Sequence, residues 1–265
     1  MEIEGYELAA NVSLLFAEHD YLDRFGAARA AGFTAVESWW PFPTADPPTA
    51  EVDGLCRAVE QAGVRLVGLN FFAGDMPGGE RGVLSDPLRR GEFESSLGVV
   101  ATVHSRTGCP VFNALYGQRR AGLTSADQAA CALANLSAAT EALPSSATVV
   151  LEALTVGENG DYPLTTCAEV ASVLAETGPG VKLLFDTYHL TNNGEDLLAC
   201  VDRYSAQIGH VQLADSPGRH EPGTGSIDFP AVFRALSANG YRGVVAAEYR
   251  PEGATVDGLG WVERS

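Results

Sequence analysis

The chain has 265 residues, of which 17 are basic and 34 acidic, giving a net charge of −17. This length fits one large domain with a sizeable buried core, so we expect residues 1–265 to form a single unit. The negative charge disfavours nucleic acid and anionic membranes as partners, because both carry phosphate groups.

Cysteine content and the first residues indicate the compartment. The five cysteines include no CxxC pair, and their odd count argues against both a disulfide framework and a cysteine zinc site. We interpret them as small buried apolar residues of a reducing cytoplasm. Acidic residues and no basic residue precede the first apolar stretch, which does not resemble a signal peptide, and no run is as long as a transmembrane helix.

Eight apolar runs predict buried strands, at residues 7–12, 35–39, 64–71, 110–116, 148–154, 181–187, 208–214 and 243–249. Most lack strict alternation, as expected for strands covered on both faces. Helix-like segments lie at residues 20–31, 49–62, 92–106, 124–143, 165–176 and 228–239. Repeated strand–helix alternation predicts a single (β/α)₈ TIM barrel. An open doubly wound sheet is the alternative, but no GxGxxG follows the first strand.

Four of the later strands run directly into polar residues, namely Glu152, Asp186, Gln212 and Glu248. The C-terminal ends of barrel strands are where active sites are built, so we expect these side chains to form one site. All four offer oxygen donors, which suit Mg²⁺ or Mn²⁺. For any one acid alone, a helix cap or a salt bridge would be an adequate explanation.

His210 and Gln212 are two residues apart on one strand and should therefore point to the same face. Gln212 is nearer the C-terminal end, so we assign the metal position to it and place His210 one layer deeper. The Pro-rich residues 41–48 and the Gly-rich residues 74–82 follow strands, and we expect both to be loops on the active-site face.

Other residues are candidates for contacting a substrate. His189 lies three residues after Asp186 in a predicted loop, where it would bond a substrate hydroxyl or cap the next helix. Arg219 would pair with a substrate carboxylate or phosphate, or lie solvated at the surface. Glu158 and Asn70 complete the predicted contacts. Weaker candidates, which packing or ordinary hydrogen bonding would equally explain, are Asn11, Glu37, Asp75, Trp39 and Trp40.

Several segments resemble the hydroxypyruvate isomerase family, within the xylose-isomerase-like barrels. They include GFTAVESWWPFP, AGDMPGGERG, VVLEAL, LFDTYH and HVQLADSPGRHEPGTG, and the resemblance covers nearly the whole chain. It implies a divalent ion, Mg²⁺ or Mn²⁺, held by the four strand-end residues. It also implies that Glu152 and Glu248 transfer the proton and that His189, Arg219 and Glu158 contact the substrate.

The implied reaction is isomerisation of a small hydroxy-keto acid, most simply hydroxypyruvate to tartronate semialdehyde through an enediolate. A sugar epimerase, a 2-oxo-tetronate isomerase, a dehydratase and a non-catalytic carbohydrate-binding barrel remain alternatives, and a homo-oligomer is compatible with the sequence. Ala153, Leu154 and Thr155 follow Glu152 where the family usually has Pro-Ile-Asn, which leaves the substrate open. An endonuclease on the same barrel would need a multi-zinc site rich in histidine and a basic groove. The chain has only five histidines and a net charge of −17, which disfavours this alternative.

Overall fold

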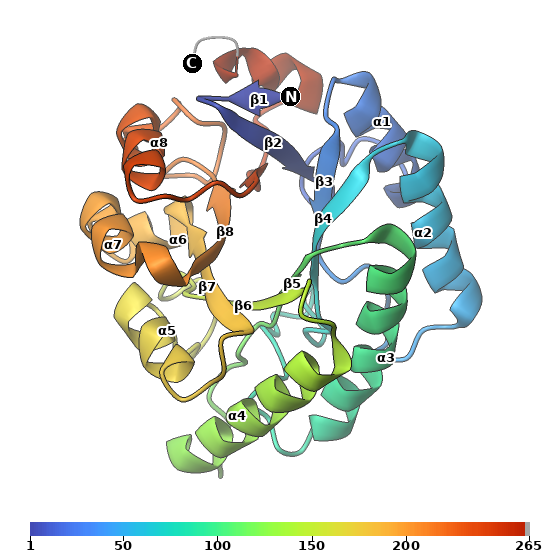
Figure 1. Ribbon diagram of the computed structural model, residues 1–265, viewed down its shortest axis with the longest axis vertical. Coiled ribbons are helices and arrows are strands. Elements are labelled where there is room, and N and C mark those ends of the chain that lie inside the picture. The colour runs from blue at the N-terminus through green and yellow to red at the C-terminus, as the bar shows by residue number, and fades with distance from the viewer. Residues whose placement is uncertain (263–265) are drawn as a thin grey trace.

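The computed structural model describes residues 1–262. Its centre is a closed parallel barrel surrounded by helices (Figure 1). The barrel closes where the first long strand pairs with the last, with Leu8 opposite Val245 and Ala9 opposite Ala246. The eight barrel strands are β2 (Tyr6–Asn11), β3 (Ala35–Ser38), β4 (Arg65–Asn70), β5 (Val111–Asn113), β6 (Thr148–Glu152), β7 (Val181–Asp186), β8 (Ile208–Leu213) and β9 (Val245–Ala247). The predicted TIM barrel is confirmed.

The helices occupy the predicted segments and two further ones. They are α1 (Arg24–Ala30), α2 (Thr49–Ala62), α3 (Arg90–Thr107), α4 (Ser125–Ala142), α5 (Cys167–Leu174), α6 (Thr187–Asn192), α7 (Leu197–Tyr204) and α8 (Phe229–Ala238). Helices α6 and α7 were not predicted, and neither was β1 (Glu2–Ile3), which pairs antiparallel with β2. β1 and α6 have only two and six residues, too few to display a hydrophobic period. The eight residues of α7 do display one, because Leu197, Cys200, Val201 and Tyr204 are buried at helical spacing, and this signal went unused.

Inward-facing side chains form two layers inside the barrel. Ala9, Ala35 and Ala246 belong to a small buried cluster of short apolar side chains. Two positions later along the same strands come Asn11, Glu37 and the residue after β9, and period-two alternation gives these positions the same inward direction. A lower layer of small side chains thus leaves the upper layer, at the C-terminal ends, to polar groups.

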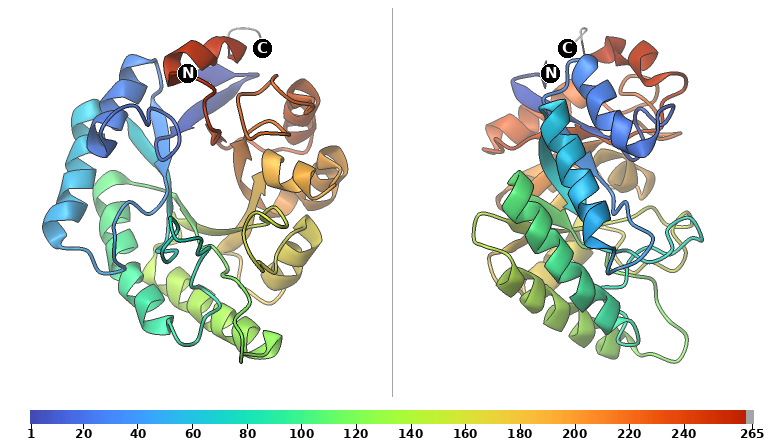
Figure 2. Two further views of the ribbon diagram at one scale, coloured as in Figure 1. Left: turned by 180° about the vertical axis from the view of Figure 1, so that it is seen from behind. Right: turned by 90° about the vertical axis from the view of Figure 1, so that its right-hand side faces the viewer.

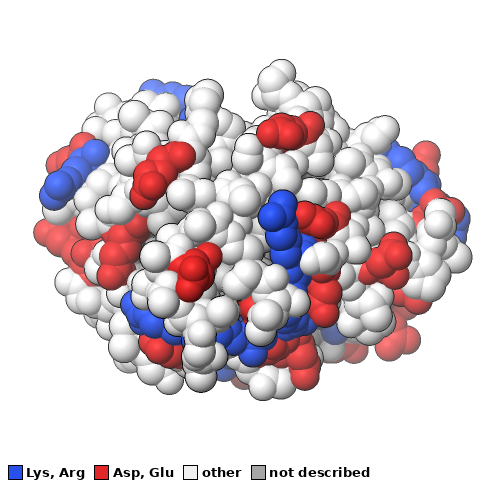
Figure 3. Space-filling view, turned by 90° about the horizontal axis from the view of Figure 1, so that it is seen from below, with Lys and Arg blue, Asp and Glu red and all other residues white. Residues whose placement is uncertain are grey.

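Long loops extend from one end of the barrel, as the right-hand view of Figure 2 shows. Residues 41–48 and 74–82 lie in two of these loops, as predicted. On the face shown in Figure 3, basic residues lie next to acidic ones and form no continuous basic surface. Within residues 1–262, no helix combines the length and the apolar character needed to cross a bilayer.

Candidate active site

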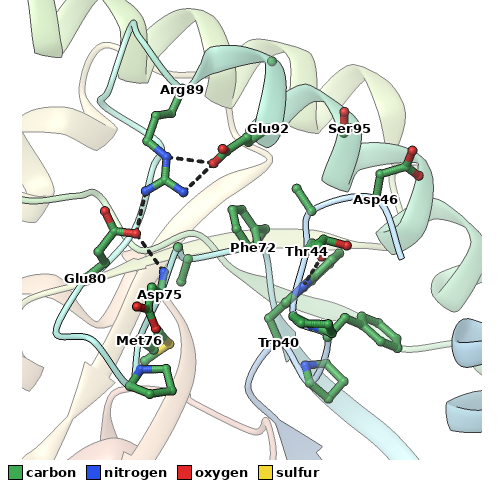
Figure 4. Close-up of a pocket in the computed structure, with 18 residues that line it drawn as sticks. Trp40, Thr44, Asp46, Phe72, Asp75, Met76, Glu80, Arg89, Glu92 and Ser95 are labelled. Atoms are coloured by element: carbon green, nitrogen blue, oxygen red, sulfur yellow. Dashed lines mark hydrogen bonds and ion pairs between the residues drawn. The ribbon is translucent and has the colours of Figure 1, made fainter. Parts of the chain in front are cut away.

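A cavity of about 590 Å³ opens at the C-terminal ends of the strands. Among the residues that line it are Asn70, Glu152, Glu158, His189, Arg219 and Glu248. A second hollow of about 900 Å³ lies beside it, between the loops after β3 and β4 (Figure 4). The two share Trp40, Met76 and Pro77, but the larger one contains none of the strand-end carboxylates. The smaller cavity is therefore the candidate active site.

Glu248 is buried and lies immediately after β9, where three side chains bond its carboxylate. Oε1 accepts bonds from Asn11 Nδ2 at 3.0 Å and from the Trp39 indole at 2.6 Å. Oε2 accepts a bond from Arg219 at 2.5 Å. The Arg219 guanidinium also lies 3.8 Å from Asp186 Oδ2, so this one cation neutralises part of the charge of both acids.

Arg219 reaches the cavity from an unusual backbone conformation. Its φ of 61° lies in the left-handed region, which is rare for a residue with a side chain. The residue's N–H donates to the Asp215 carbonyl, and its carbonyl accepts from Arg250 N–H at 2.7 Å. The side chain packs over the Tyr188 ring, with 5.4 Å between guanidinium carbon and ring centre. These contacts hold an arginine that is only 13% exposed inside the site.

Asp186 ends β7 and also begins α6. Its Oδ1 accepts the backbone N–H of His189 at 2.9 Å, which caps the helix, while its buried Oδ2 has no hydrogen-bond partner. The expected loop after β7 is therefore wrong for His189: this residue lies within α6, a helix that starts at the strand end. Neighbouring Glu152 accepts a bond from Asn113 at 2.9 Å.

Gln212 is oriented by Glu37, which lies inside the barrel on β3. Glu37 Oε1 accepts bonds from Gln212 Nε2 at 2.7 Å and from Asn11 at 2.9 Å, and Oε2 lies 2.6 Å from His210 Nε2. A carboxylate can only accept from an amide, so the amino group of Gln212 must face Glu37. The buried Oε1 of Gln212 is left without a hydrogen-bond partner. Gly68 makes room for this network, because a Cβ there would lie 3.1 Å from Glu37 Oε2.

The tautomer of His189 follows from its contacts with Thr155. The Thr155 backbone N–H donates to His189 Nδ1 at 3.1 Å, and its hydroxyl lies 2.7 Å from the same nitrogen. Nδ1 must therefore accept, which places the proton on Nε2. Burial, and then the charges of Arg219 and Arg81, lower the pKa of His189 well below its usual value. The ring is thus neutral and offers an N–H donor.

The cavity holds more negative charge than its bonded cation can neutralise. Burial, and then the charges of Glu248 and Asp186, raise the pKa of Glu152 well above its usual value. Burial raises the pKa of Glu248 to about 8, even though Arg219 opposes the shift. Burial also raises the pKa of Asp186. These shifts are those of acids that need protons or an additional cation.

Three arginines also line the cavity. Arg81, Arg219 and Arg250 all line it, and burial followed by the charges of the other two lowers the pKa of Arg81. Arg81 donates its Nε to Asn159 and one terminal nitrogen to two backbone carbonyls. Mutual repulsion of this kind would be relieved by a bound anion.

Comparisons with known proteins agree with this geometry. Residues 25–265 match the family model described as xylose isomerase-like TIM barrel. A Streptomyces coelicolor protein, assigned provisionally as a hydroxypyruvate isomerase, is 47% identical over 251 residues, which cover 91% of this chain and 89% of that protein. The chain belongs to the hydroxypyruvate isomerase family. The predicted resemblance is confirmed, and the protein is an isomerase of this family.

Two further similar proteins bear on the choice of activity. A 2-oxo-tetronate isomerase from Cupriavidus necator is 34% identical over 96% of each chain. A solved structure from Brucella melitensis, titled AP endonuclease, family 2, has a TM-score of 0.89 and 30% identity and covers 98% of each chain. Proteins that share this barrel are named for different activities, so the fold alone does not identify the activity. The residues of the cavity are the evidence that distinguishes the activities.

The structure brings the sequence-predicted residues of this isomerase together. Glu152, Glu248, His189, Arg219, Glu158 and Asn70 line the cavity, while Asp186 and Gln212 are paired neighbours on β7 and β8. Glu158 accepts a bond from the Tyr188 hydroxyl at 2.9 Å. Of the weaker candidates, Trp39 and Asn11 bond Glu248 directly, whereas Asp75 lines the neighbouring hollow.

Sequence reasoning missed three residues of the site. Asn113 ends β5 in the same way as the strand-end acids end theirs, so the signal was present but went unused. Arg81 belongs to the predicted Gly-rich loop, and Arg250 follows Glu248 by two residues. Only the folded chain shows that both arginines face the cavity.

The donor set fits a hard divalent cation. Asp186 Oδ2 and Gln212 Oε1 are buried oxygens without hydrogen-bond partners, and the raised pKa of neighbouring Glu152 is one that a bound cation would lower. Donor atoms of Glu152, Asp186 and His189 lie within 4.8 Å of one another. We exclude His189 as a ligand in its present tautomer, because Nδ1 already accepts bonds from Thr155 and Nε2 carries the proton.

Proposed function

We propose that this protein isomerises a small hydroxy-keto acid, hydroxypyruvate to tartronate semialdehyde, by moving a proton between adjacent carbons. The observation that carries the proposal is the pair of buried acids with raised pKa values, Glu152 and Glu248, in one cavity with unpartnered oxygen donors. The four strand-end residues, Glu152, Asp186, Gln212 and Glu248, would hold Mg²⁺ or Mn²⁺. The ion, when bound, would polarise the substrate carbonyl and stabilise the enediolate charge.

The two glutamates would act on opposite sides of the proton transfer. One takes the proton from the hydroxyl-bearing carbon, and the other returns a proton to the neighbouring carbon. The hydroxyl proton passes to the former carbonyl oxygen, so that the alcohol becomes the aldehyde and the ketone becomes the alcohol. Trp39 and Asn11 fix the Glu248 carboxylate, and Asn113 fixes that of Glu152, so neither acid needs to reorient during the reaction.

Substrate oxygens find donors around the two acids. His189 Nε2–H would bond a substrate hydroxyl, as its tautomer permits. Arg219, assisted by Arg81, would hold the substrate carboxylate, which supports an acid over a neutral sugar. Glu158 and Asn70 would contact the rest of the substrate from the cavity wall.

A second candidate substrate is a four-carbon 2-oxo-tetronate. The cavity of about 590 Å³ lies in the range of pockets for drug-sized ligands and exceeds what a three-carbon acid fills. The Cupriavidus necator relative, named for this activity, aligns over 96% of the chain. Comparing kcat/KM for the two acids under identical conditions decides between them.

Deuterium exchange tests the proposed chemistry. The metal-loaded protein in D₂O should introduce deuterium at the carbon beside the carbonyl, as followed by NMR. Glu152→Gln and Glu248→Gln should each slow turnover by ~10²–10⁴ because each removes a positioned acid or base. Glu221→Gln is the matched control, since Glu221 is a buried glutamate that bonds the backbone of Glu252 outside the cavity. Near-normal rates in both active-site variants would refute the two-glutamate mechanism.

A further inference from the structure

A second cluster of metal-type donors lies outside the active site, among the helices around the barrel. Cys167 is the first residue of α5, Cys200 lies in α7, and Glu195 lies between α6 and α7. One donor atom of each residue lies within 4.8 Å of the other two. Cys167 and Glu195 lie 28 positions apart in the chain, so no short sequence motif indicates the cluster.

We propose that Cys167, Cys200 and Glu195 form a zinc site that joins α5 to α7. Two sulfurs and one carboxylate oxygen are typical zinc ligands, and thiolates select zinc over the hard cations that suit the active site. The proposal revises the expectation from sequence, which disfavoured a cysteine zinc site for want of a CxxC pair. It does not depend on the proposed isomerisation.

The donors are already spaced much as zinc requires. With Zn–S of about 2.3 Å and Zn–O of about 2.1 Å, a tetrahedral ion places sulfur and oxygen roughly 3.6 Å apart. Cys200 Sγ lies 3.3 Å from Glu195 Oε2. The Cys167 backbone N–H donates to the same oxygen at 3.0 Å and so holds the carboxylate beside both thiols. Zinc would enter with small side-chain movements.

Burial of the two cysteines favours retention of a bound ion. Cys167 is 0% and Cys200 is 7% exposed, while Glu195 is half-buried, so solvent can supply a water as fourth ligand. Binding would release both thiol protons to solvent, and two thiolates, one carboxylate and Zn²⁺ would carry one net negative charge. The ion would link the helix that follows β6 to the helices that follow β7, the strands that end at Glu152 and Asp186.

Cobalt titration of the full-length protein in a phosphine reductant tests the site. Co²⁺ bound to thiolate sulfur gives an intense near-ultraviolet charge-transfer band, which a site of oxygen ligands cannot give. We expect the band to saturate at about one equivalent of Co²⁺ per chain and to disappear on addition of Zn²⁺. It should persist in Asp186→Asn, be lost in Cys167→Ser and Cys200→Ser, and remain in Cys56→Ser, a buried cysteine of α2.

Wild-type protein that binds Co²⁺ without a sulfur band would overturn the zinc site, and this result needs no variant to fold. Equal zinc content in folded wild-type and Cys167→Ser protein would do the same. A persistent band in Glu152→Gln together with lost turnover would support both proposals. Normal turnover in both Glu152→Gln and Glu248→Gln, with the band intact, would remove only the isomerisation mechanism.

Discussion

The orientations of two functional side chains, those of Gln212 and His189, are fixed by hydrogen bonds with residues behind them. Glu37 is not among the residues that line the cavity, yet it determines which end of the Gln212 amide is free. Thr155 does the same for the His189 ring. Thr155 stands where the family usually has asparagine, and its contacts with His189 give that departure a physical meaning.

Glu37→Gln should weaken metal binding by ~10–100-fold, the usual cost of losing a partner that orients a ligand. The carboxylate accepts from Asn11, Gln212 and His210, whereas an amide presents one oxygen and one amino group. In Glu37→Gln, one of these three partners must face the new amino group. Gln212 can respond by turning its own amide, because its Oε1 has no hydrogen-bond partner. Isothermal titration with Mn²⁺ measures the change. Glu7→Gln, at a partly buried glutamate that pairs with Arg65 outside the cavity, should bind Mn²⁺ normally, and equal affinities in the two variants would contradict the role of Glu37.

Thr155→Val should lower kcat/KM by roughly 2- to 10-fold, because it removes one of two hydrogen bonds to His189 Nδ1, each worth about 0.5–1.5 kcal/mol. The backbone N–H remains, so the tautomer should be retained. Nitrogen-15 NMR of histidine-labelled protein with Mg²⁺ reads the tautomer directly. A wild-type spectrum with the proton on Nδ1 would contradict the assignment of His189 as an Nε2–H donor.

At the scale of elements, strand ends supply the acids and loops supply the cations. Four parallel strands end in residues fixed by the barrel register, such as Asp186 opposite Gln212. Arg81 comes from the loop between β4 and α3, where it also bonds Asn159 of the loop after β6. Rigid strands thus position the proton-transfer groups, and the loops are free to set substrate preference.

Arg81→Ala should raise KM for a hydroxy-keto acid by roughly 10- to 100-fold, since hydrogen bonds to charged groups contribute about 1.5–3 kcal/mol. The effect on a neutral ketose should be much smaller. Steady-state kinetics on both substrates separates loss of charge from loop disorder, because a disordered loop would impair both equally. Arg119→Ala, which removes an exposed arginine paired with Asp161, is the control.

At the scale of the whole molecule, the fold buries Glu152, Asp186 and Glu248 together. The single positive charge of Arg219 cannot neutralise all three acids when they are ionised. The folded-state pKa of Glu248 is raised to about 8, so without metal the fold favours the protonated acid. As pH rises from the unfolded value near 4.5 towards 8, the unfolded state is ionised and the folded state resists ionisation. Stability of the metal-free protein is therefore lost across this window.

Chelation should accordingly lower Tm more at pH 8 than at pH 5.5. A bound divalent ion favours the ionised acids and reverses the penalty, so the Tm difference between metal-loaded and chelated protein should grow with pH and level off above about 8. Differential scanning calorimetry with and without Mg²⁺ or Mn²⁺ measures it. A Tm difference that is constant from pH 5.5 to 8 would contradict metal binding by acids with raised pKa values.

The sequence by itself determined the barrel, the family and the strand-end residues, because buried parallel strands are continuous apolar runs and their polar ends are adjacent in sequence. It could also place Gln212 above His210, since side-chain direction along a strand has a period of two. The tertiary structure alone decided that Glu37 reaches Gln212, that Arg81 and Arg250 face the cavity, and that Cys167 meets Cys200. Each depends on contacts between segments far apart in the chain, for which no local pattern exists.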